Sequence, residues 1–554
     1  MVGAMVACVV TVACTTSDGS APRSAPSEGS QEASVASACD LPSEQLLRVW
    51  RGTIPGVGGN VQLVPAEPHY LGAGFSHTGP WDYVQRVPMF FYGPPHVAAA
   101  GIVDVEATLA DIAPTTGAII GFDFDAPDGE VLEQVLRGPE GREHRPRLLL
   151  TVVWDAVGRN VLDAWPDAWP NLRRMIPGGA WIDHATVGSS PSNTPPTHAT
   201  IGTGGFPRNH GILDSYVRID GREYEDAELG PSALQLPTLA DRYAAAANDP
   251  RALTGIVATL TSHVGMLGHG SLWPGVPPPL AVVRQEDTVE TAGEEGAFWR
   301  LTSGIEPYFR FPDYVNDMPG IERDLEALDR ADGQIDGRWG PHPFSALKDG
   351  FSSPARTTYQ TRIVKEVIRR EGFGADPVTD LLFVNFKATD TIGHIWTLNS
   401  DEVRQSLEVQ DAELGELVAF LDEQVGRGEW AMVLTADHGH QFDPAISGAF
   451  QMTARQIESF LETRFGGPDH PVVEKVRPTE VWVDEQALAE VGATLDDVAA
   501  AIREVVPADL AEAGADLSAW PVDEQLFSAA FPTSVLDDLL CLTERERGSG
   551  DATG

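Results

Sequence analysis

The chain has 554 residues, which is long enough for a large hydrophobic core or for several domains. Hydrophobic residues make up 42% of it and charged residues 21%, fractions that are typical of a globular protein rather than a disordered one. Its 81 acidic and 38 basic residues give a formal net charge of −43 at pH 7. Nucleic acids and anionic membranes need a concentrated basic surface, so we expect no nucleic-acid-binding face.

The N-terminal segment 1–40 has the composition of an export signal and a disordered tether. Its first fourteen residues are small and mostly apolar and end in Cys14, and residues 15–38 are rich in Ser, Ala, Gly and Pro. This order resembles a bacterial lipoprotein signal with Cys14 as the lipidated residue, and an ordinary cleaved signal peptide is the alternative. No other segment has the ~20 apolar residues of a membrane span. We therefore expect an exported bacterial protein, either a cell-envelope lipoprotein or extracellular, that meets a membrane only through a lipid anchor.

Two further cysteines, Cys39 and Cys541, flank the region that is expected to fold. Export would place them in a compartment where disulfides form and persist. We expect a bridge between them, which would hold the two ends of the folded region together. Two unpaired thiols are the alternative.

The region before residue 146 combines strand-like and helix-like patterns. Residues 87–92 (VPMFFY) have the apolar and aromatic composition of a strand. Residues 105–120 read as a helix. Residues 123–144 read as a connector, because acidic residues, Gly and Pro interrupt any apolar stripe.

The middle of the chain alternates between buried-strand and helical patterns. Residues 148–154 (LLLTVVW), 381–386 (LLFVNF) and 430–434 (WAMVL) are apolar runs bounded by turn signals, as in strands of a parallel sheet. Residues 401–424 carry apolar side chains at helical spacing. This alternation predicts an α/β sandwich with a mainly parallel central sheet.

The pattern changes again after His440. Residues 479–484 (TEVWVD) have the composition of a strand, and 488–505 have helical spacing. We expect a small α+β cap over residues 446–515. Residues 516–554 would then be a C-terminal extension.

Three carboxylates directly follow the predicted central strands: Asp155, Asp390 and Asp437. Functional side chains gather beyond the carboxyl ends of parallel strands, so these three should meet at one edge of the sheet. The segments DTIGH and DHGH add His394 and His438, which are typical ligands of divalent ions. Two divalent ions about 4 Å apart would need several carboxylate and imidazole ligands of this kind. Mixed Asp and His ligands favour zinc, with iron, manganese or calcium as alternatives.

Residues 147–215 contain the segment TPPTHATIGTG after the strand and Asp155. This segment, together with the D-x-x-G-H and D-H-G motifs, resembles the alkaline phosphatase superfamily, in its type I phosphodiesterase/nucleotide pyrophosphatase branch. The resemblance implies an alkaline-phosphatase-like three-layer α/β/α sandwich whose main catalytic domain covers residues 146–445. It also implies a phosphoryl-transfer site with two divalent metal ions.

The resemblance assigns roles to individual residues. Thr194 is similar to the nucleophile of the family and would also contact a metal ion. The metal ligands would be Asp155, Asp390, His394, Asp437 and His438. A plain helix N-cap is the alternative role for Thr194, and Ser192 is the alternative nucleophile. His198 is expected to support the nucleophile loop.

The last metal ligand of the family is expected near the N-terminus, at His77. Residues 74–122 resemble the closing segment of the family, including its final metal-binding histidine and a helix that contains D-I-A-P-T. The only later histidine outside the motifs is His470, in a turn-like setting. We therefore expect a circularly permuted catalytic domain, in which residues 41–122 supply the closing segment.

The predicted substrate is a small phosphate ester. Monoesterase members of the family clamp a phosphate dianion with a Lys/Arg pair, whereas residues 261–266 (TSHVGM) here contain no such pair. This difference favours a diester or nucleotide pyrophosphate over a monoester. Lys387, His263 and His269 are candidate substrate contacts. The alternatives are a phosphomonoesterase, a phosphoryl or phospho-alcohol transferase, or a non-catalytic metal-binding envelope lipoprotein.

Overall fold

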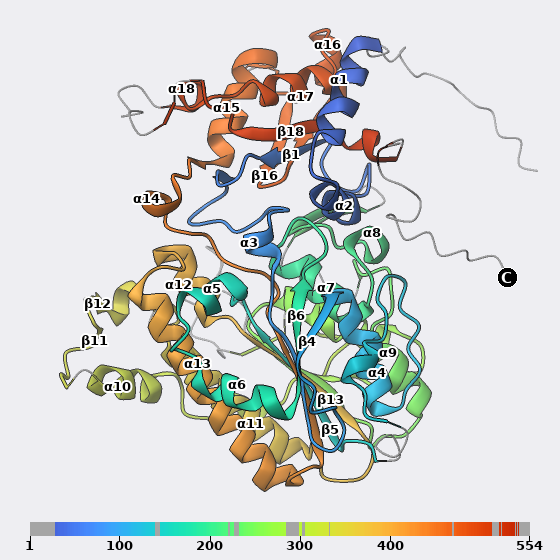
Figure 1. The fold of residues 1–554 in the computed structure, drawn as a ribbon, viewed down its shortest axis with the longest axis vertical. Helices are drawn as coiled ribbons and strands as arrows, with labels where there is room; N and C mark the ends of the chain where they lie inside the picture. Colours follow the sequence, from blue (N-terminus) through green and yellow to red (C-terminus); the bar gives the residue numbers. More distant parts are fainter. Residues whose placement is uncertain are drawn as a thin grey trace, which may run out of the picture.

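The computed structural model describes residues 28–541, apart from 139–143, 220–221, 226–231, 284–298, 302–304, 332, 349, 468–469, 512–519, 522, 538 and 540. Figure 1 shows a large α/β part with a smaller cap at one end of the long axis. Within the described residues, no helix combines the length and the apolar character that a membrane crossing requires. The candidate lipidation residue Cys14 lies outside these residues.

The large part is built on an eight-stranded sheet with the order β10-β9-β13-β5-β14-β3-β6-β4. All neighbouring strands in it are parallel except β3, which is antiparallel to both β14 and β6. This topology confirms the predicted α/β class with a mainly parallel sheet. The strands are β3 (Met89–Tyr92), β4 (Gly101–Thr108), β5 (Leu148–Trp154), β6 (Ala180–Thr186), β9 (Thr254–Val257), β10 (Leu280–Val282), β13 (Asp380–Phe386) and β14 (Trp430–Thr435).

Both faces of this sheet are covered, which explains why its central strands are apolar throughout. All seven residues of β5 are buried. Leu148, Leu150 and Val152 belong to the core under helices α11 (Ala355–Glu371) and α13 (Asp401–Leu421). Leu149 and Val153 belong to the core under α4 (Ile112–Ile120) and α9 (Leu239–Ala247) on the opposite face. The result is a three-layer sandwich (Figure 1).

Strand direction determines which chain segments meet at the edge of the sheet. Strands β5, β6, β13 and β14 are parallel to one another, so their carboxyl ends lie at the same edge. Because β3 runs in the opposite direction, it begins at that edge. The chain just before Met89 therefore reaches the same place as the segments that follow the other four strands.

The cap is assembled from both ends of the chain. Its four-stranded sheet has the order β16-β17-β1-β18, with β1 (Val61–Pro65) buried between β17 (Glu480–Val483) and β18 (Phe527–Pro532). The last strand is β16 (Val473–Arg477). The cap thus differs from the predicted 446–515 unit, since it takes β1 from the predicted closing segment and β18 from the predicted extension. Without these two strands, β17 would leave one edge unpaired.

The end of the predicted tether is folded as well. Residues 28–39 form helix α1, which lies against β18 and α17 (Leu495–Arg503). Ala38 is fully buried, and Ser34 Oγ donates a hydrogen bond to Asp496 Oδ1 at 2.6 Å. Packing against the cap thus orders a helix whose own composition predicted disorder. Cys39, its last residue, forms a disulfide with Cys541.

Two predicted helices have different bounds. Over 105–120, β4 continues to Thr108 because it pairs with β6, and only then does a 3₁₀ turn lead into α4. Over 488–505, the chain forms two helices, α16 (Glu485–Glu490) and α17, which are separated at Gly492. Gly492 has φ 76°, a left-handed conformation that ends a helix.

We expect Leu150→Ala to destabilise the protein by about 2–5 kcal/mol, because it removes a fully buried side chain from the centre of β5 and leaves a cavity. Ile102→Ala, at a position in β4 that is 66% exposed, is the control and should change stability by less than about 0.5 kcal/mol. Urea unfolding of the two variants measures the difference. Equal effects would contradict the assignment of β5 to the core.

Candidate functional site

The predicted site residues meet at the edge of the sheet defined above. Asp155 follows β5, and Asp437 and His438 follow β14. Asp390 and His394 lie on helix α12 (Ala388–Trp396), which begins just after β13. Two more residues complete the cluster: Thr194 begins helix α7 (Thr194–Thr203) after β6, and His77 lies in the segment that leads to β3.

One group of possible metal ligands consists of His77, Asp390 and His394. The two Nε2 atoms lie 3.2 Å apart, His77 Nε2 lies 3.4 Å from Asp390 Oδ1, and His394 Nε2 lies 3.5 Å from the same oxygen. Asp390 and His394 are one helical turn apart on α12, so both point to the same side. Gly393 permits this arrangement, since a Cβ there would lie 2.1 Å from His440 Nε2.

The hydrogen bonds around this group leave its ligand atoms free for a cation. His77 Nδ1 lies 3.1 Å from the Ser192 carbonyl oxygen and donates to it, so Nε2 carries the lone pair. Burial lowers the pKa of His77 to about 3, which keeps the ring neutral. Among the described residues, no donor forms a hydrogen bond to Asp390 Oδ1. Two imidazole nitrogens and a carboxylate oxygen thus lie within 4.8 Å of one another, an arrangement that suits a divalent ion.

The predicted ligands Asp155, Asp437 and His438 form a second group around the His438 ring, where the ligand atoms of Asp155, Asp390 and His438 all lie within 4.8 Å of one another. His438 Nε2 lies 3.2 Å from Asp437 Oδ2 and 3.8 Å from Asp155 Oδ1. His438 Nδ1 donates to the Gly439 carbonyl oxygen at 3.0 Å, so Nε2 is the ring nitrogen that faces the two carboxylates. In the part of the chain that the structure describes, Asp437 Oδ2 and His438 Nε2 have no hydrogen-bond partner.

Backbone geometry helps to aim this second group. Ala156 has φ 61°, a conformation that is uncommon for alanine and marks a constrained site. Its backbone N–H donates to Asp437 Oδ1 at 3.0 Å. This bond occupies one carboxylate oxygen and turns the other, Oδ2, toward His438.

The charges of the cluster favour a bound cation. Burial alone would lower the pKa of His438, but the Asp437 and Asp155 carboxylates outweigh it and raise that pKa to about 9. Burial would raise the pKa of Asp155, but the Lys387 ammonium outweighs it and holds that pKa far below its usual range. The same negative potential that retains a proton on His438 would attract a divalent ion in its place.

The Thr194 hydroxyl is linked to both groups through the Lys387 ammonium. Lys387 Nζ donates to Thr194 Oγ1 at 2.9 Å and also lies 2.9 Å from Asp155 Oδ1 and 2.8 Å from Asp390 Oδ2. Thr194 is the first residue of α7, and Asn193 occupies the N-cap position, so Thr194 is not the cap itself. The Ser192 hydroxyl donates instead to the carbonyl oxygen of His77 at 3.0 Å.

The remaining candidate histidines differ in position. His263 Nε2 lies 3.5 Å from Asp155 Oδ2, so the structure brings it to the cluster. His198 Nδ1 donates to the Thr194 carbonyl oxygen at 2.8 Å, which is consistent with a supporting role. His269 is different, because its ring nitrogens contact Asp241 Oδ2 at 2.8 Å and the Leu234 carbonyl oxygen at 3.0 Å. With both nitrogens used in this way, His269 has none left for a substrate.

His440, which was not predicted as a site residue, packs against the ligand histidines. Its ring lies 5.5 Å from the rings of both His77 and His394, and its Nδ1 accepts from the Gln441 backbone N–H at 2.8 Å. The proton is therefore on Nε2, which faces the Asp390 carbonyl oxygen at 3.4 Å. His440 thus packs beneath the ligands. Its position two residues after the predicted ligand His438 could have indicated that His440 lies near the site.

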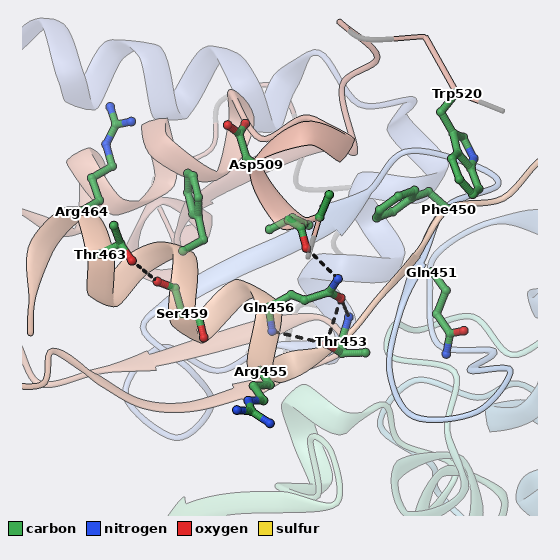
Figure 2. Close-up of a pocket in the computed structure, with 13 residues that line it drawn as sticks. Phe450, Gln451, Thr453, Arg455, Gln456, Ser459, Thr463, Arg464, Asp509 and Trp520 are labelled. Carbon is green, nitrogen blue, oxygen red and sulfur yellow. Dashed lines mark hydrogen bonds between the residues drawn. The ribbon is translucent and has the colours of Figure 1, made fainter. Parts of the chain in front are cut away.

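A cavity of about 1090 Å³ lies away from this cluster, in the cap. Figure 2 shows it between α15 (Ala454–Phe465) and α18 (Pro507–Leu510), with Phe450 and Trp520 at one side. None of the predicted site residues lines it.

Comparison with known proteins identifies the family. A model of the family "Type I phosphodiesterase / nucleotide pyrophosphatase" matches residues 149–545. The chain belongs to this family. It is therefore a hydrolase of phosphate esters in the alkaline phosphatase superfamily.

Individual relatives are distant. A calcium-transporting ATPase of Myroides odoratus is 23% identical over 414 residues, which cover 64% of this chain and 72% of the relative. Alkaline phosphatase PafA of Elizabethkingia meningoseptica is 23% identical over 445 residues, which cover 71% of this chain and 78% of the relative. The crystal structure of wild-type PafA gives a TM-score of 0.47 at 20% identity, covering 65% of this chain and 76% of that chain.

We expect His77→Gln to weaken divalent-ion binding at the group of His77, Asp390 and His394 by more than about 100-fold, since losing even an outer-shell partner of a metal ligand costs about 10- to 100-fold. The metal content after dialysis against buffered Zn²⁺, measured by mass spectrometry, checks this. His96→Gln is the control, because His96 is a buried histidine whose ring nitrogens contact the His144 and Gly428 carbonyl oxygens and none of the ligand residues. Unchanged metal content in His77→Gln would remove His77 from the ligand set.

Proposed function

We propose that the protein is a phosphodiesterase or nucleotide pyrophosphatase that acts through a phosphothreonine intermediate at a two-metal site. The observation that carries this proposal is the position of Thr194 Oγ1. It lies at the start of α7, within 2.9 Å of the Lys387 ammonium, which in turn contacts one carboxylate of each ligand group. A nucleophile so placed is surrounded by groups that stabilise negative charge.

The two ligand groups fit two divalent ions. Asp390, His394 and His77 would hold the first ion, while Asp155, Asp437 and His438, with Thr194, would hold the second. Mixed carboxylate and imidazole ligands favour zinc. Bound there, the ions would lower the pKa of a coordinated hydroxyl and neutralise the charge that develops on the phosphoryl oxygens.

The reaction would proceed in two displacements. Thr194 Oγ1 loses its proton to solvent and forms a bond to phosphorus, while the bond from phosphorus to the leaving oxygen breaks and that oxygen takes a proton. Water then attacks phosphorus, the bond to Oγ1 breaks, and the threonine hydroxyl is restored. Pro195 and Pro196 have no backbone N–H, so among the first three residues of α7 only Thr194 carries one that could donate to a phosphoryl oxygen.

The preference for a diester rests on the side chains around Asp155. The segment 261–266 lies in a 3₁₀ helix (Thr261–Met266) packed against α7, and it brings His263 to the site in place of a Lys/Arg pair. Burial lowers the pKa of His263, so it contributes a neutral ring. A site without this pair suits a phosphate monoanion better than a dianion.

A circular permutation of the catalytic domain accounts for the position of His77. The family match begins at residue 149, so the segment that supplies His77, β3 and β4 precedes it. Termini that lie close together on the surface tolerate such a rearrangement. The Cys39–Cys541 disulfide supports export, because such bonds persist outside the reducing cytoplasm.

Phosphomonoesterase activity is the second candidate function, because the relative PafA is named an alkaline phosphatase. We expect the zinc-loaded protein to hydrolyse bis-p-nitrophenyl phosphate with a kcat/KM at least about tenfold above that for p-nitrophenyl phosphate, which corresponds to about 1.4 kcal/mol of differential transition-state binding. Absorbance at the nitrophenolate band measures both rates, and a dinucleotide substrate extends the comparison. The opposite order would assign the protein to the monoesterases.

We expect Thr194→Ala to lower kcat by more than about 1,000-fold while the metal content stays near that of the wild type, because the nucleophile is lost but the Asp and His ligands remain. Thr194→Ser should retain measurable activity. Ser192→Ala is the control for the alternative nucleophile and should stay within about tenfold of the wild type. A Thr194→Ala protein with near-normal turnover would exclude the phosphothreonine intermediate.

A further inference from the structure

Lys387 is the cationic side chain at the centre of the cluster, and no metal-ligand motif requires it. It lies at the N-cap position of α12, directly after β13, and its side chain is 10% exposed. Its ammonium group has three N–H donors and three close acceptors, Thr194 Oγ1, Asp155 Oδ1 and Asp390 Oδ2, at 2.8–2.9 Å. Every donor of the ammonium is therefore directed at a residue of the proposed site.

The elements around Lys387 fix its direction. Asp155 and Asp390 follow the neighbouring strands β5 and β13, so the ammonium joins two adjacent strand ends beneath the start of α7. Thr391 Oγ1 donates to the Lys387 carbonyl oxygen at 3.1 Å and anchors its backbone. A side chain held in this way is pre-organised and needs no rearrangement when charge develops on the nucleophile.

We propose that Lys387 is a catalytic residue that acts as a fixed third cation on the nucleophile oxygen and competes with the divalent ions for the Asp155 and Asp390 carboxylates. This inference rests on the proposed phosphothreonine mechanism and adds a role for a residue outside the ligand set. The stabilisation of Oγ1 and the competition for carboxylates affect two different measurable quantities, the turnover rate and the metal affinity. Removing the ammonium should slow turnover and strengthen metal binding.

The effect on turnover follows from the role of Thr194 Oγ1 in each displacement. In the first, this oxygen is the nucleophile, and a hydrogen bond from Lys387 stabilises its deprotonated form. In the second, it is the leaving group, and it departs from phosphorus with the bonding electron pair. The ammonium keeps its three protons throughout, and the hydrogen bond to Oγ1 stabilises the charge on that oxygen as the bond breaks.

The effect on metal binding follows from the shared oxygens. An ion bound to Asp155 Oδ1 or Asp390 Oδ2 at about 2.0–2.2 Å would stand within about 5 Å of the ammonium. At that distance the two positive charges repel each other, and the ammonium neutralises carboxylates that would otherwise serve the ion alone. A lysine with a purely structural role would instead preserve the ligand geometry, so its loss would weaken metal binding.

The test compares Lys387→Met with the wild type, using the full chain. We expect kcat for bis-p-nitrophenyl phosphate to fall by about 100- to 1,000-fold, as for loss of one pre-organised donor to a developing charge. Rapid acid quenching should show that phosphothreonine both forms and decays more slowly than in the wild type, because Oγ1 takes part in both displacements. The Zn²⁺ affinity, measured by competition with a chelator, should rise by about tenfold or more, equivalent to about one pKa unit of charge interaction.

Two further variants serve as controls. Lys365→Met removes a lysine whose ammonium lies 3.7 Å from Glu416 on the outer helices, and it should change neither Zn²⁺ affinity nor kcat. In the double variant Thr194→Ala/Lys387→Met, the second substitution should lower kcat no further but should still raise Zn²⁺ affinity. If Lys387→Met does not fold, Lys387→Gln replaces it in every measurement.

The outcomes separate this inference from the proposed function. A Lys387 variant with weaker Zn²⁺ binding, or with a kcat within threefold of the wild type, overturns the catalytic role of Lys387. Wild-type protein that forms no phosphothreonine, together with an active Thr194→Ala variant, overturns the mechanism itself. Higher Zn²⁺ affinity together with lower kcat in Lys387→Met supports the inference.

Discussion

Burial of three carboxylates at one edge of the sheet is the constraint on which the rest of this structure depends. Asp155, Asp390 and Asp437 are each at most 3% exposed, and their strands bring them together. Uncompensated buried charges are costly, so positive groups must share the space. His438, drawn toward the protonated form, and Lys387, held as an ammonium, are the compensation that the chain itself provides. Asp390 Oδ1, Asp437 Oδ2 and His438 Nε2 have no hydrogen-bond partner among the described residues, and they indicate where divalent ions would add to it.

The direction of β3 explains how a residue near the N-terminus joins this cluster. A strand parallel to its neighbours would deliver His77 to the opposite edge, whereas the antiparallel β3 begins where β5, β13 and β14 end. The cap likewise brings together segments from the two ends of the chain. It pairs β1 with β17 and β18, so the segments before His77 and after β14 are held against each other.

The sequence predicted the parts of this structure that leave a local signal. The apolar run of β5 predicted a buried strand of a parallel sheet, and the D-x-x-G-H segment predicted Asp390 and His394 as neighbouring ligands beyond a strand end. Pairings between distant segments leave no such signal, so β1 and β18 were assigned to other units. Helix α1 was read as a tether because its order comes from packing against the cap. The position of Lys387 in the sequence indicated that it lies near the site, but not which acceptors its flexible four-carbon side chain reaches.

The charge of the assembled cluster connects Lys387 to the choice of substrate. Two divalent ions and one ammonium would exceed three carboxylates by two positive charges. A diester monoanion attacked by a threonine alkoxide gives a transition state with two negative charges, which equals this excess of positive charge. A monoester dianion would give a transition state with three negative charges. A second fixed cation, such as the Lys/Arg pair that segment 261–266 lacks, would be needed to balance that extra charge. In the proposed mechanism, Lys387 would therefore contribute one positive charge to a site that suits a diester monoanion.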